Sequence, residues 1–228
     1  MPTPGCPEWD YETHPRLKAL FPQRIADLIT AIYTAKCTAV EACSNSRPIH
    51  CSLFTDLTPP KHPYYSGHYR GERDCLIGYE VHIQAADLLN QDPMVGSPSF
   101  LVPHEMARYG KLMAKQIKEL AAFQRGAILM DPVNRMATIV RFACHAFVTI
   151  LTIHPFVNGN GHVARALLWI ILFHFGYAVP LWTIDPRPPF PEYSAMIAAH
   201  RRNNVDLLEQ FVISTIAIVD NSVVLTRN

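Results

Sequence analysis

The sequence of 228 residues carries almost no net charge, because twenty lysines and arginines are balanced by nineteen aspartates and glutamates. Proteins that bind nucleic acids or anionic membranes through charge have a clustered basic excess. We therefore expect neither a nucleic-acid polymer nor a membrane as a partner. Glycine is scarce, at ten residues, and 49% of the residues are hydrophobic against 17% charged. This composition excludes collagen-like and disordered chains and predicts a globular domain with a sizeable core.

The sequence also shows no secretory signal, no long apolar run and no CxxC pair. Its start is neither basic nor apolar. The most apolar stretch, residues 166–182, is shorter than the roughly 20 residues of a membrane span and predicts a buried helix, with an interfacial segment as the alternative. A chain of this length needs no disulfides to compensate for a small core. We therefore expect six unpaired cysteines, a reducing compartment and a cytoplasmic protein.

Apolar residues recur at steps of three and four along most of the chain, which is typical of amphipathic helices. The predicted helical segments are 17–43 (one or two helices), 104–123, 133–153, 163–175, 193–202 and 205–219. Turn-rich residues at 44–66 and 90–103 predict loops. Residues 1–15 predict a flexible proline-rich arm, and residues 75–81 predict a short strand in a hairpin. The expected fold is mainly α: a compact helical domain over residues 16–228 with a small β-hairpin.

The strongest chemical signal is the segment HPFVNGNGHVAR, residues 154–165. Gly159, Asn160 and Gly161 directly precede a predicted helix, whose first N–H groups have no acceptors within the helix. With the helix dipole, this turn predicts a phosphate-binding site. His162 and Arg165 share one face of the first turn, within reach of a bound phosphate.

His154 precedes this turn, and Pro155 prevents the preceding helix from continuing past it. A neutral imidazole beside a bound phosphate is suited to act as a general base for an incoming hydroxyl. An Asn-Gly-Asn-Gly sequence alone is usually an ordinary turn between helices. The ordered set of His-Pro-Phe, Gly-Asn-Gly and a following arginine within twelve residues favours an active site.

This segment resembles the motif of the Fic domain family, His-Pro-Phe-x-(Asp/Glu)-Gly-Asn-Gly-Arg-x-x-Arg. The matching positions are His154, Pro155, Phe156, Gly159, Asn160, Gly161 and Arg165. Residues 67–70 (GHYR) are similar to the Gly-x-(Tyr/Phe)-Arg ahead of the family's flap, and residues 75–81 to the flap itself. Residues 193–211 are similar to the family's closing helices, so the resemblance covers about residues 28–216. It implies a compact helical domain that transfers AMP from ATP, with Mg²⁺, to a hydroxyl side chain of a target protein.

The resemblance also implies roles for individual residues. His154 would be the general base, and Gly159, Asn160, Gly161, His162 and Arg165 would bind the nucleotide phosphates. Asn158 would stand at the metal position, and His200 would contact the adenine. The flap residues Leu76, Ile77, Gly78 and Tyr79 would align the target segment as an added strand.

Two positions depart from the family motif. Asn158 replaces an acidic metal ligand, and a neutral amide should bind Mg²⁺ more weakly. His162 replaces an arginine and cannot make its bidentate phosphate contact. These changes predict a slower or differently selective enzyme and leave two alternatives open: transfer of another phosphoryl-containing group, or a nucleotide-binding module without turnover. A metal-dependent hydrolase that uses His145, His154 and His162 is disfavoured by their spacing.

Residues 37–43 are the nearest match to the family's inhibitory helix motif, (Ser/Thr)-x-x-x-Glu-(Gly/Asn). By this resemblance residues 34–43 would form the inhibitory helix, and Glu41 would pair with Arg165. The alternative is that Glu41 faces solvent on an amphipathic helix. The sequence indicates neither the target protein nor the oligomeric state.

Overall fold

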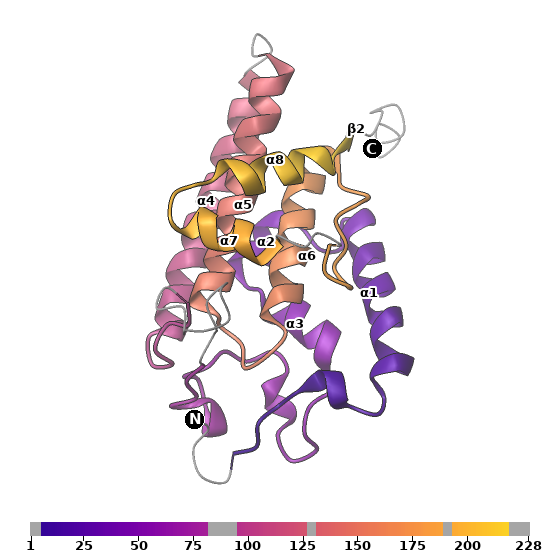
Figure 1. The fold of residues 1–228 in the computed structure, drawn as a ribbon, viewed down its shortest axis with the longest axis vertical. Helices are drawn as coiled ribbons and strands as arrows, with labels where there is room; N and C mark the ends of the chain where they lie inside the picture. The colour runs from indigo at the N-terminus through magenta and orange to yellow at the C-terminus, as the bar shows by residue number, and fades with distance from the viewer. Residues whose placement is uncertain (1–5, 82–94, 127–130, 189–192, 219–228) are drawn as a thin grey trace.

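Helices dominate the computed structural model, which describes residues 6–81, 95–126, 131–188 and 193–218 (Figure 1). The α-helices of the described residues are α1 (Leu17–Tyr33), α2 (Ala39–Ser44), α3 (Arg47–Phe54), α4 (Val102–Gly126), α5 (Pro132–Ile153), α6 (Asn160–His174), α7 (Tyr193–Arg201) and α8 (Asp206–Ser214). Short 3-10 helices cover Tyr11–Thr13, Pro63–Tyr65 and Asp74–Leu76. The strands β1 (Tyr177–Ala178) and β2 (Ala217–Ile218) pair antiparallel.

Helices α5 and α6 form the centre of the fold. They pack against each other, α2 packs on α4 and α6, and α8 crosses α5 (Figure 1). Helix α6 is buried on nearly all sides, from Asn160 to Leu172, as expected for a helix that is apolar all round. It ends before Gly176, whose positive φ of 86° gives the usual glycine stop. One hydrophobic core runs from Trp9 to Val212.

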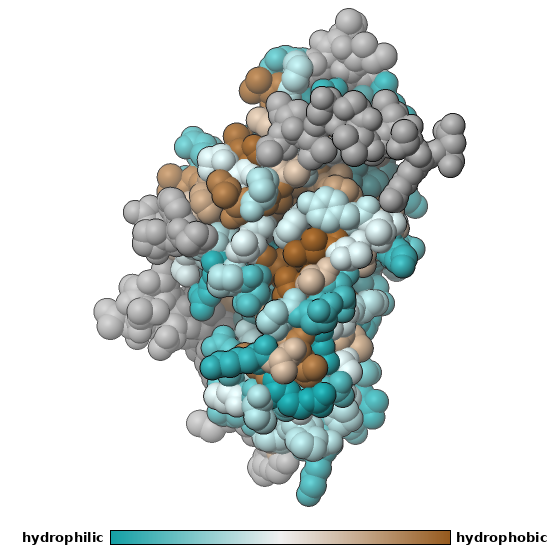
Figure 2. All heavy atoms as spheres, turned by 90° about the vertical axis from the view of Figure 1, so that its right-hand side faces the viewer, coloured by the Kyte–Doolittle hydropathy of each residue, from teal (hydrophilic) through white to brown (hydrophobic). Residues whose placement is uncertain are grey.

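One described helix, α5, is long and apolar enough to cross a membrane by length and composition. Of its most apolar window, 56% is buried inside the protein. This burial is what a core helix shows, since its apolar side chains already face α6 and α8. On the face that carries α1, apolar residues appear in separate small areas among hydrophilic ones (Figure 2).

The helices predicted from periodicity are present, with bounds that shift by a few residues. The structure adds α3 within residues 44–66, which were predicted to be turn-rich. Pro48 occupies the first turn of α3, where proline is tolerated. Ile49, Leu53 and Phe54 then bury one face of this short helix. Tertiary burial therefore stabilises a helix whose sequence contains turn-forming residues.

The strand predicted at residues 75–81 is wrong for the described chain. A 3-10 helix, Asp74–Leu76, is followed by a turn in which Gly78 has a φ of 71°. The main-chain N–H groups of Ile77 and Tyr79 donate to the carbonyls of Asp74 and Leu76 at 3.1 and 3.2 Å. Because these groups bond within the turn, they are not available to a ladder. The other arm of the predicted hairpin would lie at residues 82–94, outside the described residues.

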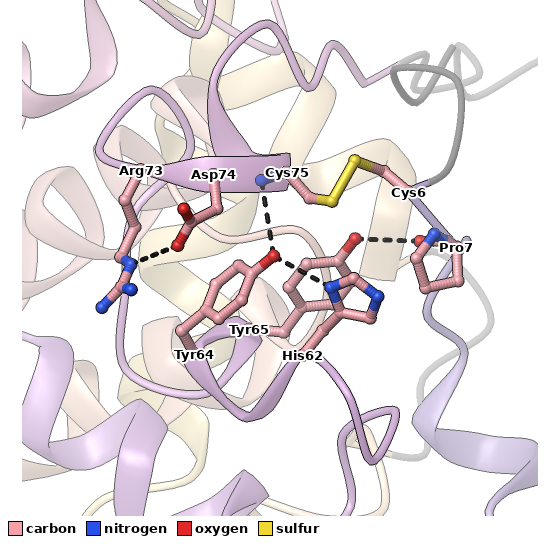
Figure 3. Close-up of a disulfide and its surroundings, with 8 residues drawn as sticks. All are labelled: Cys6, Pro7, His62, Tyr64, Tyr65, Arg73, Asp74 and Cys75. Carbon is pink, nitrogen blue, oxygen red and sulfur yellow. Dashed lines mark hydrogen bonds and ion pairs between the residues drawn. A yellow bond between two sulfur atoms is a disulfide. The ribbon is translucent and has the colours of Figure 1, made fainter.

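Two further expectations about the N-terminus are wrong. Residues 6–14, which we call the N-terminal strap, pack onto the domain, and Trp9 and Tyr11 are each only 6% exposed. Cys6 forms a disulfide with Cys75, so these two cysteines are not free thiols (Figure 3). With Cys6 and Cys75 joined, the cysteines of this chain do not indicate a reducing compartment. Cys37, Cys43, Cys51 and Cys144 are unpaired.

Candidate active site

A pocket of about 660 Å³ opens at the N-terminal end of α6. It lies between the loop that joins α5 to α6, residues 185–187, helix α7 and the N-terminal strap. Its polar lining consists of Tyr11, Glu12, His154, Asn158, Asn160, His162, Arg165, Asp185, Arg187, Tyr193, Ser194 and Arg201. The structure thus brings together most of the residues that the motif predicted.

The turn before α6 is held by the side chain of Asn160. Its Oδ1 accepts from the N–H of Phe156, and its Nδ2 donates to the carbonyl of the same residue, both at 2.8 Å. Gly159 has a φ of 76°, and a Cβ there would lie 2.3 Å from Cε2 of Phe54. Only glycine fits this position without a shift of the core. Gly159, Asn160 and Gly161 line the pocket, and because the Asn160 amide is engaged, the main-chain N–H groups at the start of α6 are the groups of this turn that could bind an anion.

His154 ends α5 in a left-handed conformation, with a φ of 54°. This backbone is uncommon for a non-glycine residue and persists only when the surroundings determine it. Arg70 provides that support. Its Nε donates to the carbonyl of His154 at 2.9 Å, one Nη2 hydrogen bond reaches Ile153 at 3.2 Å, and its main-chain N–H reaches Pro155 at 2.8 Å. Arg70 thus fixes the carbonyls on both sides of the imidazole.

The Arg70 guanidinium is fully buried and also donates to the carbonyls of Tyr79 and Ser97, at 3.0 and 2.9 Å. Burial lowers the pKa of Arg70 to about 10, so it stays charged at neutral pH. Burial and then the Arg70 charge lower the pKa of His154 from 6.5 to about 4. The imidazole of His154 is therefore neutral near pH 7, the form that accepts a proton.

Arg165 lies on the first turns of α6 and lines the pocket, although it is only 3% exposed. Its Nε donates to the carbonyl of Ile184 at 2.7 Å. One Nη1 would lie 3.0 Å from a Cβ at Gly161. The guanidinium therefore lies beside the turn at residues 159–161, and its contact with a phosphate stays a prediction.

His162 does not present a free cation to the pocket. Its Nε2 donates to Oδ1 of Asp185 at 3.0 Å, and its ring packs edge-on against Tyr11, Phe21 and Phe54. Burial lowers the pKa of His162, and the hydrogen bond to Asp185 opposes this shift. The same hydrogen bond lowers the pKa of Asp185. A neutral imidazole and an ionised carboxylate thus occupy the region where the motif has an arginine.

Asn158 is engaged within the chain rather than directed toward a metal. Its Oδ1 accepts from the N–H of Gly159 at 2.8 Å, and its Nδ2 donates to the carbonyl of Trp9 at 3.0 Å. Its own carbonyl accepts from Nε2 of His50, whose pKa burial lowers to about 3. Across the described residues, no group of three or more His, Cys, Asp or Glu side chains could hold a metal ion. Asn158 therefore does not fit the role of a Mg²⁺ ligand in this arrangement.

The predicted adenine contact, His200, lies elsewhere. It lines a second pocket of about 610 Å³ between α4, α5 and α8, together with Arg141, His145 and Glu209. The residues of α7 that do line the first pocket are Tyr193, Ser194, Ile197 and Arg201. His200 is not among the residues that line the first pocket, so the described structure does not support its assignment to the nucleotide pocket.

The predicted flap residues do not line the first pocket in the described structure. Leu76 and Tyr79 are buried, Ile77 is 59% exposed, and Gly78 forms the turn between them. Their link to the site is indirect, because the Tyr79 carbonyl accepts from Arg70. Their role in aligning a target stays a prediction.

Glu41 has a local structural role at the start of α2. Its carboxylate accepts from the main-chain N–H of Thr38 at 3.4 Å, and its own N–H donates to the Thr38 hydroxyl at 3.3 Å, which together form a capping box. The carboxylate also accepts from the Thr38 hydroxyl at 2.7 Å. Glu41 is exposed, and the described contacts of Arg165 do not include it. The structure therefore favours the solvent-facing alternative for this glutamate.

Several residues of the pocket region were not assigned a role from the sequence, among them Arg70, Asp185, Tyr11 and Glu12. The GHYR resemblance pointed to Arg70 without showing what it binds. Asp185 and the two strap residues lie 20 residues or more from the motif, and their local sequences carry no signal of a site. Only the packing of distant segments places them at the pocket.

The model of the Fic/DOC family matches residues 49–172, which are more than half of the chain. Among solved structures, the chain is similar to BepC, a VirB-translocated effector protein of Bartonella tribocorum, crystallised with AMPPNP. The two share 14% sequence identity, the similarity covers 89% of each chain, and the TM-score is 0.48. No curated protein matches the sequence.

Proposed function

Because the chain belongs to the Fic/DOC family, we propose that it transfers AMP from ATP to a Ser, Thr or Tyr hydroxyl of a target protein. One observation carries this proposal. The imidazole of His154, held neutral by burial and Arg70, shares a pocket with the N-terminal end of α6 and with Arg165. This arrangement supports the proposal, because a base for a hydroxyl and the groups that would bind phosphate would share one cavity.

In this reaction His154 takes the proton of the target hydroxyl as its oxygen attacks the α-phosphorus of ATP. The new O–P bond forms, the bond between the α-phosphorus and its bridging oxygen to the β-phosphate breaks, and pyrophosphate leaves. The N–H groups at the start of α6 and the Arg165 guanidinium stabilise the negative charge of the phosphates. Arg70 acts through His154, because it orients the backbone that carries the imidazole.

A second candidate function is transfer of another phosphoryl-containing group. A further alternative is a module that binds a nucleotide without turnover. The observation that favours it is the engagement of Asn158 with Trp9 and of His162 with Asp185. Both side chains lie at positions where the family motif has charged phosphate or metal contacts. With both ends of its amide engaged, Asn158 does not fit as a Mg²⁺ ligand in this arrangement.

The test uses ATP labelled at the α or the γ position, the purified protein and a cell lysate. We expect label from the α position in a target protein, and loss of that label in His154→Ala. His104→Ala is the matched control, because His104 is exposed at the start of α4. Label from the γ position would instead show phosphorylation. Nucleotide binding without any transferred label would contradict the enzymatic proposal.

A further inference from the structure

We propose that the N-terminal strap is a fixed wall of the donor pocket and that Glu12 on this wall is a specificity-determining residue. On this proposal, which rests on the proposed function, Glu12 disfavours donors with a long anionic tail. The motif region, residues 154–165, lies more than 140 residues away in sequence, so the strap is an addition to the site that the motif does not contain.

Several independent contacts fasten the strap to the domain. Cys6 is bonded to Cys75, and the Tyr65 hydroxyl donates to the Pro7 carbonyl at 3.0 Å (Figure 3). The Trp9 indole donates to the Leu57 carbonyl at 2.8 Å. Trp9 is also surrounded by the rings of other residues, namely Tyr11, His50, Phe54 and Tyr65. Since the disulfide is only one of these attachments, we expect the strap to stay in place when the disulfide is reduced.

Asn158 couples the strap to the motif. Its Nδ2 donates to the Trp9 carbonyl at 3.0 Å. An aspartate or glutamate, the usual residues of the family motif here, has no hydrogen to donate and would place a carboxylate oxygen against that carbonyl oxygen. The strap therefore explains why residue 158 departs from the motif. The side chain at this position binds a main-chain carbonyl of the strap instead of a metal ion.

The strap then reaches the pocket next to His162. The Tyr11 hydroxyl lies 3.5 Å from Nδ1 of His162 and 3.3 Å from Oε1 of Glu12, and both strap residues line the pocket. The carboxylate of Asp185 accepts a hydrogen bond from the other ring nitrogen of His162, Nε2. Two carboxylates therefore flank a neutral imidazole at the position where the family motif has an arginine.

This charge arrangement predicts donor selectivity. Arg165, Arg187 and Arg201 supply positive charge to the same pocket, so a phosphate is still attracted. Each additional negative charge that approaches Glu12 and Asp185 is repelled by them. The affinity for ATP relative to that for AMP should therefore be lower than in a pocket that carried only the charges of the arginines. This affinity ratio should rise when Glu12 loses its charge.

The test compares the Kd values of AMP, ADP and ATP, measured by calorimetry, for the wild type, Glu12→Gln and Glu8→Gln. Glu8 is the matched control, because it is an exposed glutamate of the same strap that does not line the pocket. We expect Glu12→Gln to raise the affinity for ATP relative to AMP by about three- to tenfold, the size of a partly screened charge interaction within the pocket. Glu8→Gln should leave that ratio within twofold, roughly the effect of a distant, screened charge.

A second measurement tests whether the N-terminal strap is a fixed wall of the pocket. Hydrogen exchange at residues 6–14 should be slow in the free protein and should slow further at Tyr11 and Glu12 when ADP is bound. Asn158→Asp should speed exchange in the strap. Equal affinity ratios for the two glutamate variants, or unchanged strap exchange in Asn158→Asp, would overturn the inference alone. If the wild type bound none of the three nucleotides, the inference and the proposed function would both be overturned.

Discussion

Replacing Arg70 with lysine should destabilise the protein and disturb the His154 backbone, although the charge is kept. The guanidinium donates to the carbonyls of His154, Tyr79, Ser97 and Ile153 in one plane. A lysine has three donors on a single nitrogen, so it cannot reach all the carbonyls that are arranged around the planar guanidinium. At least two buried carbonyls would lose their partner.

The magnitude follows from these lost bonds. A buried polar group without a partner costs about 1–3 kcal/mol. Two such carbonyls give about 3 kcal/mol, a large fraction of the roughly 5–15 kcal/mol by which domains are stable. The left-handed backbone of His154 adds to this cost, because the contacts that hold its φ of 54° are the ones removed.

The assay is urea unfolding of wild type, Arg70→Lys and Arg73→Lys. Arg73 is the matched control, because it lies three residues away and its contact with Asp74 is exposed. We expect a large loss of stability for Arg70→Lys and a change within about 0.5 kcal/mol for Arg73→Lys. Equal stability of the two variants would refute the structural role of the buried Arg70 guanidinium.

The charge of Arg70 is tested separately by the pH titration of the His154 ring, followed by NMR. Because Arg70 is the second-largest cause of the low pKa of His154, Arg70→Met should raise that pKa toward its ordinary value. A titration curve that does not move would refute the electrostatic part of the reasoning, even if stability falls. This readout does not depend on any enzymatic activity.

Three further predictions concern stability. The pKa values of His50 and His154 are lowered to about 3 and about 4, so between pH 6.5 and 4 the unfolded chain binds more protons than the folded one. The free energy of unfolding should therefore fall as the pH is lowered through this window, and denaturant titrations that show no fall would contradict the burial of these rings. Gly159→Ala should lower the free energy of unfolding by more than about 2 kcal/mol, because the added Cβ would lie 2.3 Å from Phe54. Thermal unfolding measures this loss. Gly78→Ala is the control, because Gly78 also has a positive φ but no neighbour within 4 Å of an added Cβ. Cys6→Ser should lower stability by up to about 4 kcal/mol, because the disulfide closes a loop with a sequence separation of 69, whereas Cys51→Ser should have little effect; equal unfolding midpoints for the two variants would contradict the disulfide.

The helices of this protein are largely predictable because their stabilising pattern is local. Ile139, Val140, Ala143 and Phe147 recur at helical spacing and are all buried on α5. Helix α3 is the exception. It follows Ser46 and has Pro48 in its first turn, and it is stabilised by burial of Leu53 and Phe54 against other segments.

The strap shows the opposite situation. Three prolines within residues 2–7 predict an arm with little structure of its own. Nothing in this local sequence indicates that Trp9 fits among His50, Phe54 and Tyr65 or that Cys6 meets Cys75. These contacts join residues about 40 to 70 positions apart in sequence, and a pattern read over one helix or one strand cannot contain them.

The sequence alone determined the mainly α fold, the turn from His154 to Arg165 and the family resemblance, because each depends on residues that are close together in the chain. The surroundings of that turn could be seen only after the chain was folded. The tertiary structure placed Arg70 behind His154, Asp185 and the strap beside His162, and His200 in a different pocket. The physical reason is that charge, burial and hydrogen-bond partners at a site are set by whichever distant segments pack there.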